Sequence, residues 1–179
     1  MSQFGMVIDV SKCIGCYACS IACENQNNLA PGEAFIHYET QELGEYPHVH
    51  RETVPLQCMH CTDAPCQQVC PTGATYTTAD GLVMVETTKC IGCLYCMAAC
   101  PYQVRVVNPE THEVRKCRFC HIESLQGKEP SSCVAACPTN CRVFGDLEDP
   151  ESEISQYLKT HRAKRLKGDL TKAHLYYVR

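Results

Sequence analysis

Short apolar runs, separated by turn-forming residues, recur along much of the chain. Residues 4–10 form one such run and predict a strand near the start. The runs at 74–77 and 82–86 flank an Asp-Gly turn pair, which is typical of a β-hairpin. The runs at 105–108 and 113–116 flank a turn in the same way. The pattern therefore predicts several short strands and hairpins rather than one large sheet.

Two stretches differ from this pattern. Residues 25–55 are polar and contain Pro and Gly, so we interpret them as a surface insertion with at most a short strand near 35–38. Residues 151–167 carry Ile154, Leu158 and Arg162 at helical spacing and predict a helix. The basic residues within this predicted helix are typical of a solvated face, with docking to a partner or to anionic lipid as the alternative. They are Lys159, Arg162, Lys164, Arg165 and Lys167.

Cysteine dominates the composition and changes the picture of the interior. The chain has 17 cysteines in 179 residues and no tryptophan, and the cysteines form part of its 45% hydrophobic share. A disulfide scaffold and structural zinc sites are the ordinary explanations. The odd count and the recurrence of cysteines in quartets favour bound inorganic clusters instead.

The central quartet has the spacing of a bacterial ferredoxin loop. Residues 89–101 read KCIGCLYCMAACP, with the order C-x-x-C-x-x-C-x-x-x-C-P. Three closely spaced thiolates can bind three irons of one [4Fe–4S] cluster, while the fourth cysteine of such a run ligates a neighbouring cluster. Residues 12–23 repeat this spacing, including Lys-Cys-Ile-Gly-Cys, and such a repeat predicts a duplicated ferredoxin.

Two further quartets bring the total to four. Cys58, Cys61, Cys66 and Cys70 precede Pro71, and Cys117, Cys120, Cys133 and Cys137 precede Pro138. Because the predicted hairpin at 74–86 joins the second quartet to the third, these two should exchange their fourth cysteines, and the first and last quartets should then do the same. The predicted ligand sets are Cys13, Cys16, Cys19 and Cys137; Cys23, Cys117, Cys120 and Cys133; Cys58, Cys61, Cys66 and Cys100; and Cys70, Cys90, Cys93 and Cys96.

The expected fold class is α+β, with tandem ferredoxin-like modules of short hairpins and short helices around four cubane [4Fe–4S] clusters. Residues 1–24 with 102–141 would form an outer module, and 56–101 an inner module. Residues 25–55 would be the insertion. Residues 142–179, which end in Leu-Tyr-Tyr-Val before Arg179, would be a tail with a helix that docks on a partner.

Several residues near the quartets need a separate interpretation. Cys141 is left over and is predicted not to be a ligand. The Cys117–His121 segment matches the haem attachment pattern C-x-x-C-H, but its cysteines are needed for the fourth quartet. His60 and His121 are interpreted as hydrogen-bonding or solvated residues rather than metal ligands. Lys12, Lys89 and Lys116 each precede a first cysteine and are candidates for tuning a cluster, or simply solvated charges.

The remaining features exclude some functions. The net charge of −4 argues against a nucleic-acid partner. No nucleophile–base pair or phosphate loop stands out, so no catalytic residue is predicted. The twelve residues before Cys13 include Asp9 and Lys12, so we expect no signal peptide there, and no apolar run has the length of a membrane span.

The quartet order over about residues 6–152 resembles the four-cluster electron-transfer subunits of the molybdopterin oxidoreductases. The segment CPTNCRVFGDLEDPES at 137–152, together with LGEYP at 43–47, is most similar to the B subunits of polysulfide and thiosulfate reductases. The resemblance implies a non-catalytic chain that relays single electrons between a membrane quinone-reactive subunit and a molybdopterin catalytic subunit. The implied process is anaerobic respiration of polysulfide, thiosulfate or tetrathionate.

Alternatives stay open at this point. The chain could serve another oxidoreductase, acting on dimethyl sulfoxide, arsenate, formate or hydrogen, or it could be a free polyferredoxin. The resemblance implies a position peripheral to the cytoplasmic membrane, on the periplasmic face after export together with a partner, with the cytoplasmic face as the alternative.

Overall fold

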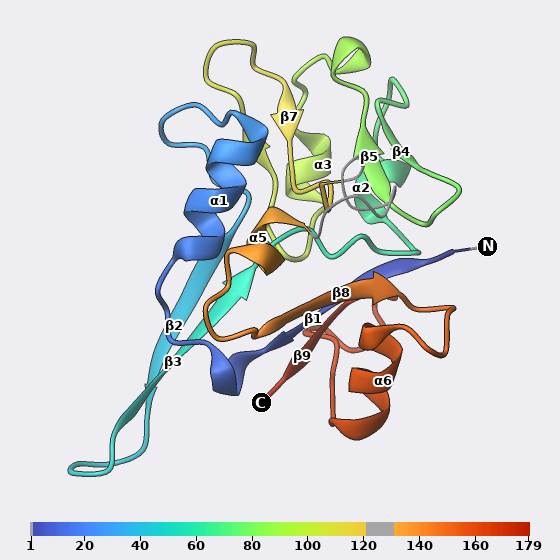
Figure 1. Ribbon diagram of the computed structural model, residues 1–179. Coiled ribbons are helices and arrows are strands. Elements are labelled where there is room, and N and C mark those ends of the chain that lie inside the picture. Colours follow the sequence, from blue (N-terminus) through green and yellow to red (C-terminus); the bar gives the residue numbers. More distant parts are fainter. Residues whose placement is uncertain (1, 121–130) are drawn as a thin grey trace.

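Strand β1 (Phe4–Asp9) is the middle strand of a three-stranded sheet, and it confirms the strand predicted at 4–10. β8 (Arg142–Asp146) pairs with it antiparallel and β9 (Leu175–Val178) pairs with it in parallel. Val7 therefore has Val143 on one side and Tyr176 on the other. The computed structural model describes residues 2–120 and 131–179 (Figure 1).

The two faces of this sheet cover different parts of the molecule. Met6 and Ile8 point into a core that also contains most of the buried cysteines. Val7 points the other way, into a small apolar cluster with Ile154 of helix α6 (Glu153–Thr160). The sheet thus lies between α6 and the cysteine-rich half of the chain, as Figure 1 shows.

Helix α6 is shorter than the predicted helix at 151–167. It begins where the side chain of Ser152 accepts a hydrogen bond from the backbone N–H of Ser155, which is a standard N-terminal cap. It ends at His161, whose backbone is extended. Arg162 and the basic residues that follow it lie outside the helix. The spacing of Arg162 from Ile154 and Leu158 therefore predicted too long a helix.

The tail also differs from its expected role. We expected its last residues to lie on a partner, but Leu175, Tyr177 and Val178 are buried within the chain itself. Since β9 hydrogen-bonds along β1, its apolar side chains complete the core rather than a docking surface. The division of the chain into outer and inner modules stays a prediction.

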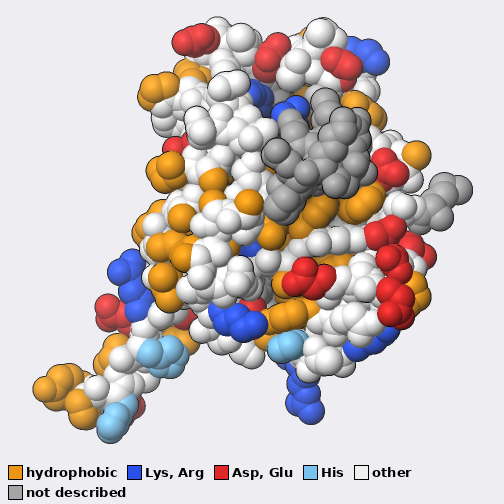
Figure 2. All heavy atoms as spheres, viewed as in Figure 1, with side chains coloured by type: hydrophobic (Ala, Val, Ile, Leu, Met, Phe, Trp, Pro, Cys, Tyr) orange, Lys and Arg blue, Asp and Glu red, His pale blue; other side chains and the backbone are white. Residues whose placement is uncertain are grey.

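The polar segment 25–55 contains more regular structure than expected. β2 (His37–Leu43) and β3 (His50–Leu56) form an antiparallel hairpin over seven residue pairs. Polar pairs such as Gln41 and Glu52, which are 2.8 Å apart, stabilise its outer part, and this is why apolar periodicity did not predict it. The hairpin reaches away from the rest of the molecule in Figure 1, and Figure 2 shows hydrophobic side chains at its far end.

The remaining elements are short and support the cysteine loops. The predicted hairpins are confirmed as β4 (Thr75–Thr77) with β5 (Val83–Val85), and β6 (Val106–Val107) with β7 (Val114–Arg115). The helices are α1 (Ala18–Asn27), α2 (Pro65–Gln68), α3 (Tyr95–Ala98) and α5 (Ser132–Ala135), and each carries the third cysteine of one quartet. One-turn helices η1 (Val10–Lys12) and η2 (Thr87–Lys89) lead into the first and third quartets.

Candidate iron–sulfur cluster sites

The two loops with identical cysteine spacing also share their backbone geometry. Gly15 and Gly92 have φ angles of 65° and 66°, and the residues two places later, Tyr17 and Leu94, have 61° and 64°. These left-handed positions curl the loop so that backbone N–H groups turn toward the enclosed sulfurs. At Gly92 a side chain is also excluded by the carbonyl oxygen of His112, which lies 2.9 Å from where a Cβ would be. The sequence repeat is therefore a structural repeat.

The second and third quartets come together in two cavities. Site 3 is defined by Cys58, Cys61, Cys66 and Cys100, which line an empty volume of about 340 Å³. Site 4 is defined by Cys70, Cys90, Cys93 and Cys96, which line about 320 Å³. Each cavity thus contains three cysteines of one quartet and the fourth cysteine of the other, the arrangement that the sequence predicts.

The first and last quartets meet in the same way. Site 1 is defined by Cys13, Cys16, Cys19 and Cys137, and its cavity has an empty volume of about 320 Å³. The base of the β2–β3 hairpin forms part of its wall through Tyr38 and Pro55, and the Tyr38 hydroxyl is 3.2 Å from the Cys19 sulfur. Segment 25–55 therefore contributes to a site as well as to the surface.

Site 2 is defined by the four buried cysteines Cys23, Cys117, Cys120 and Cys133. Burial, and then the neighbouring thiols of Cys133 and Cys120, raises the pKa of Cys23 to about 12. Burial likewise raises the pKa of Cys117, and the thiols of Cys23 and Cys133 add to that rise. Four thiols placed this close in an apolar interior are costly as isolated thiolates and suited to a cationic cluster core.

Backbone N–H groups point at several of these sulfurs. Thr75 donates to Cys70 Sγ at 3.5 Å, Val114 to Cys90 Sγ at 3.5 Å, and Cys141 to Cys137 Sγ at 3.3 Å. Burial acts to raise the pKa of Cys70, but hydrogen bonds from Thr75, Thr72 and Ala74 outweigh it and lower that pKa to about 7. These donors stabilise thiolate sulfur, which is the form that binds iron.

The donor sets fit the cofactor that the spacing predicts. Sites 1, 3 and 4 have cavities of nearly equal volume, and backbone N–H groups donate to sulfur at sites 1, 2 and 4. All four sites are defined by four cysteines. Thiolate quartets with N–H···S bonds are the ordinary environment of [4Fe–4S] clusters. The assignment of each sulfur to one iron stays a prediction.

Cys141, predicted not to be a ligand, lies beside a predicted ligand. Its buried Sγ is 3.4 Å from Cys137 Sγ, and it contributes to the wall of site 1. Burial, followed by the hydrogen bond to Cys137, raises the pKa of the Cys141 thiol. The thiol form can therefore donate a weak hydrogen bond to the Cys137 sulfur.

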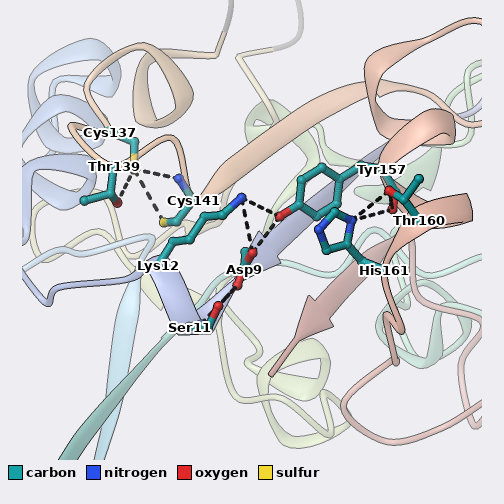
Figure 3. A network of polar contacts seen from close by, with 9 residues as sticks. All are labelled: Asp9, Ser11, Lys12, Cys137, Thr139, Cys141, Tyr157, Thr160 and His161. Carbon is teal, nitrogen blue, oxygen red and sulfur yellow. Dashed lines mark hydrogen bonds and ion pairs between the residues drawn. The ribbon is translucent and has the colours of Figure 1, made fainter.

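Helix α6 is connected to the first cysteine loop by a polar network, which Figure 3 shows. The Tyr157 hydroxyl donates to the Asp9 carboxylate at 2.6 Å, and Lys12 Nζ donates to the Tyr157 oxygen at 2.8 Å. Ser11 also donates to Asp9, through its hydroxyl at 2.6 Å. Because Lys12 directly precedes Cys13, this network fixes the start of the loop that lines site 1.

The three candidate lysines differ in their surroundings. Lys12 is partly exposed and pairs with Asp9, and Lys89 is exposed. Lys116 is buried, but its Nζ donates to the backbone carbonyls of Val83 and Cys117 rather than to sulfur. Two buried arginines lie at the sites instead. Arg142 approaches the sulfurs of Cys19 and Cys133, and Arg105 contributes to the wall of site 3. Sequence reasoning missed both because arginine is usually a surface residue.

The histidine predictions are only partly covered by the structure. His60 is buried and stacks on Phe119, with ring centroids 4.0 Å apart. Burial holds the pKa of His60 well below its ordinary value, so its ring is neutral at pH 7. His121, and with it the end of the haem attachment pattern, lies outside the described residues. Among residues 2–120 and 131–179, no helix is both long and apolar enough to cross a membrane.

Comparison with known proteins gives the same picture. Two families described as 4Fe-4S dicluster domains match residues 12–74 and 49–147. The sequence is 46% identical to Protein NrfC of Escherichia coli (strain K12) over 181 residues, which cover 98% of this chain and 80% of that protein. It is 40% identical to a polysulfide reductase chain of Wolinella succinogenes over 183 residues, 98% of this chain and 94% of that one.

A third relative is a putative dimethyl sulfoxide reductase iron-sulfur subunit of Halobacterium salinarum. It is 38% identical over 211 residues, which cover 99% of this chain and 79% of that protein. The matches confirm the resemblance drawn from the quartet order, and two dicluster domains account for four [4Fe–4S] clusters. This protein belongs to the 4Fe-4S dicluster family and is an iron–sulfur electron-transfer subunit of the kind found in reductase complexes.

Proposed function

We propose that sites 1 to 4 each hold one [4Fe–4S] cluster through the four cysteines that define them, and that the clusters form a row in that order. Arg142 supports the contact between sites 1 and 2, because it reaches Cys19 and Cys133. Gln57, which precedes Cys58 of site 3, lies 3.9 Å from the Cys117 sulfur of site 2. Arg105 contributes to the wall of site 3. Burial raises the pKa of Cys96 in site 4, and the positive charge of Arg105 opposes that rise.

The observation that carries the function is the gradient of burial along this row. Cys16 of site 1 is exposed, and in site 4 three of the four cysteines are half-buried. All four cysteines of site 2 and three of site 3 are buried. Such a row, open at both ends and closed in the middle, suits a relay that takes up one electron at one end and releases it at the other.

Exposed apolar side chains surround both open ends. Ile14 and Ile91 contribute to the walls of sites 1 and 4, and Ile21 and Tyr95 are exposed on the helices α1 and α3 that carry a cysteine of each site. Figure 2 shows hydrophobic side chains gathered over the face that carries α1. Apolar surface of this kind is typical of protein contacts. One end therefore meets a molybdopterin-containing catalytic subunit and the other a membrane subunit that reacts with quinone.

The chain does not catalyse a reaction by itself in this proposal. Its cysteines serve as ligands of the clusters. Its role is to set the distances between the clusters and their reduction potentials, so that single electrons pass along the row. The terminal acceptor is a sulfur compound, polysulfide, thiosulfate or tetrathionate, because a relative that this chain matches over 94% of its length is named as part of a polysulfide reductase. The complex lies on the periplasmic face of the cytoplasmic membrane.

The test compares the single chain with the complex purified from its own membranes under anaerobic conditions. Reduced single chain should transfer no electrons to polysulfide, thiosulfate, tetrathionate, dimethyl sulfoxide or arsenate in sustained turnover. The complex should contain molybdenum and reduce one of the sulfur compounds. Turnover by the single chain, or a complex without molybdenum, would overturn the proposal. Protease treatment of sealed spheroplasts should digest the subunit if it faces the periplasm.

A further inference from the structure

Two arginines occupy equivalent positions in the two halves of the cluster row. Arg105 lies five residues after Cys100 and Arg142 lies five residues after Cys137, in the segments CPYQVR and CPTNCR. Both are buried, with 4% and 2% of their surface exposed. Arginine is rarely buried without a paired acid. In residues 2–120 and 131–179 no carboxylate forms an ion pair with either one.

Arg142 reaches sulfurs of two different sites. One terminal nitrogen lies 3.6 Å from Cys19 Sγ of site 1, and the other lies 3.9 Å from Cys133 Sγ of site 2. The second nitrogen also donates to Gln57 Oε1 at 2.7 Å and approaches Met6 Sδ at 3.5 Å. A neutral amide and sulfur atoms therefore surround a permanent positive charge.

Arg105 has the same relation to sites 3 and 4. It lies against the cavity of site 3 and donates to the hydroxyl of Thr75, in β4, at 3.2 Å. Thr75 in turn lines the cavity of site 4, and its backbone N–H donates to Cys70 Sγ at 3.5 Å, so the hydrogen bond from Arg105 connects the two sites. Arg105 Nη2 and Arg142 Nε are buried donors without a protein partner in the described part of the chain. Sulfides of a bound cluster would satisfy them.

We propose that Arg142 and Arg105 are positioning residues for electron transfer, each raising the reduction potentials of the two clusters that it separates. The proposal rests on the ligand sets proposed above. A [4Fe–4S] cluster held at each site would take up one electron, and its core charge would fall from 2+ to 1+ while its four thiolates kept the whole site anionic. A buried cation stabilises the more negative, reduced form, and it does so strongly because the surrounding dielectric is low.

A shared cation also affects how two neighbouring clusters are filled. An electron on one cluster repels an electron on the next, and this repulsion is largest between buried sites. A guanidinium between the two sites leaves this repulsion unchanged, but it stabilises an electron on either cluster and so offsets the repulsion when both members of a pair are reduced. This role accounts for the repeated position of the arginine, since sites 1 and 2 share Arg142 and sites 3 and 4 share Arg105.

The test measures all four midpoint potentials by anaerobic redox titration followed by electron paramagnetic resonance. Arg142→Gln should lower the potentials of the clusters in sites 1 and 2 together, by about tenfold in the reduction equilibrium constant, which is 59 mV for one electron. Sites 3 and 4 should keep their potentials. Arg105→Gln should give the opposite pattern. Arg142→Lys, which keeps the charge, should restore most of the shift.

Two further variants keep the test decisive. Gln57→Glu leaves Arg142 in place but sets a carboxylate against it, and provides a second test if Arg142→Gln does not assemble. The decisive reading is site 1, which should fall in potential because Arg142 reaches Cys19. Gln57 itself lies against Cys117 of site 2 and precedes Cys58 of site 3, so a fall confined to those two sites would be a direct effect of the new carboxylate and would count against Arg142. Lys89→Gln, a matched loss of exposed charge beside site 4, should leave the potentials unchanged because water screens it. The role of the arginines would be overturned if an arginine variant with full iron content shifted the midpoint potential of only one of its two clusters, or of neither. A wild-type protein with fewer than four clusters would instead overturn the ligand sets.

Discussion

Cys70 and Cys100 end successive quartets, and each lies in the cavity that the first three cysteines of the other quartet define. Cys100 is thus 34 or more residues away in sequence from its cavity partners Cys58, Cys61 and Cys66. This exchange ties the two loops together, so damage at one sulfur should appear at a site whose other ligands belong to a different loop.

We predict that Cys100→Ser damages the cluster of site 3 and leaves that of site 4. Serine oxygen is a poorer iron ligand than thiolate, and the cavity of site 3 would retain three sulfurs. The measurement is the spectrum of each reduced cluster, compared with a Cys141→Ser variant. That control should keep all four clusters, since a serine hydroxyl at position 141 would still lie beside Cys137. A cluster lost in the control would show that Cys141 is a ligand.

The anaerobically purified chain should contain iron and acid-labile sulfide, about sixteen of each per polypeptide, because each of four cubane cores holds four iron and four sulfide. Elemental analysis and sulfide determination on the same sample measure both. Zinc at a comparable level, without sulfide, is the result that would contradict the cluster content.

The two apolar ends of the row should bind different partners. Ile14→Asp and Ile91→Asp each place a charge on an isoleucine; these two residues are 68% and 67% exposed. Each variant should weaken binding of one partner at least tenfold and spare the other, because a buried unpaired charge is costly at an interface. Leu170→Asp, at a leucine of 68% exposure far from both loops in the sequence, is the matched control. Equal binding by all three variants would rule out docking at the ends.

Ile154→Ala should destabilise the sheet. Ile154 is fully buried against β8, where its Cγ2 lies 3.0 Å from the position of a Cβ on Gly145. Its truncation should cost about 2–5 kcal/mol of unfolding free energy. Anaerobic denaturant titration measures this, with Gln156→Ala on the exposed face of the same helix as the control. An unfolding free energy reduced no more than in the Gln156 variant would contradict the prediction.

Asp9 should make stability depend on acid pH. Burial acts to raise its pKa, but hydrogen bonds from Ser11, Tyr157 and Lys12 outweigh burial and hold that pKa below 3.8. A pKa lowered by folding contributes stability that is complete above the unfolded value, near 4, and is lost as the pH falls through the folded value. Asp9→Asn should therefore lose stability at pH 7 and show a smaller further loss below pH 4.

The measurement for Asp9 is denaturant unfolding of both proteins from pH 7 downward, over the pH range in which their iron and sulfide contents stay unchanged. Asp63→Asn provides the control, because Asp63 forms an exposed ion pair with Lys172 and such pairs contribute little. An Asp9→Asn variant whose pH dependence equals that of the unmodified protein would show that the network in Figure 3 does not stabilise the folded chain.

Local patterns predicted the local features well. Cysteine spacing and the repeated Lys-Cys-Ile-Gly-Cys predicted both loops of Gly15 and Gly92, and alternation around Asp80 predicted β4 and β5, since these features depend on neighbours in sequence. β2 and β3 were missed because polar cross-strand pairs, rather than an apolar face, hold their outer half together.

Long-range relationships were harder to predict. β8 and β9 owe their strand form to pairing with β1, more than 130 residues away, and a tail sequence alone cannot indicate that partner. Arg105 and Arg142 were overlooked although their position five residues after the cysteine of a Cys-Pro pair was visible as a repeat. The burial of both arginines, and the approach of Arg142 to two cysteine sulfurs, became visible only in the structure.

The pairing of β1 with β8 and β9 also sets an order of events while the ribosome makes the chain. Every cysteine of sites 3 and 4 has been made by residue 100, whereas sites 1 and 2 each need a cysteine beyond residue 130. β1, made first, has neither neighbour until residues 142–146 and 175–178 emerge. The nascent chain can therefore receive iron and sulfide at sites 3 and 4 early, while sites 1 and 2 are the last to be completed.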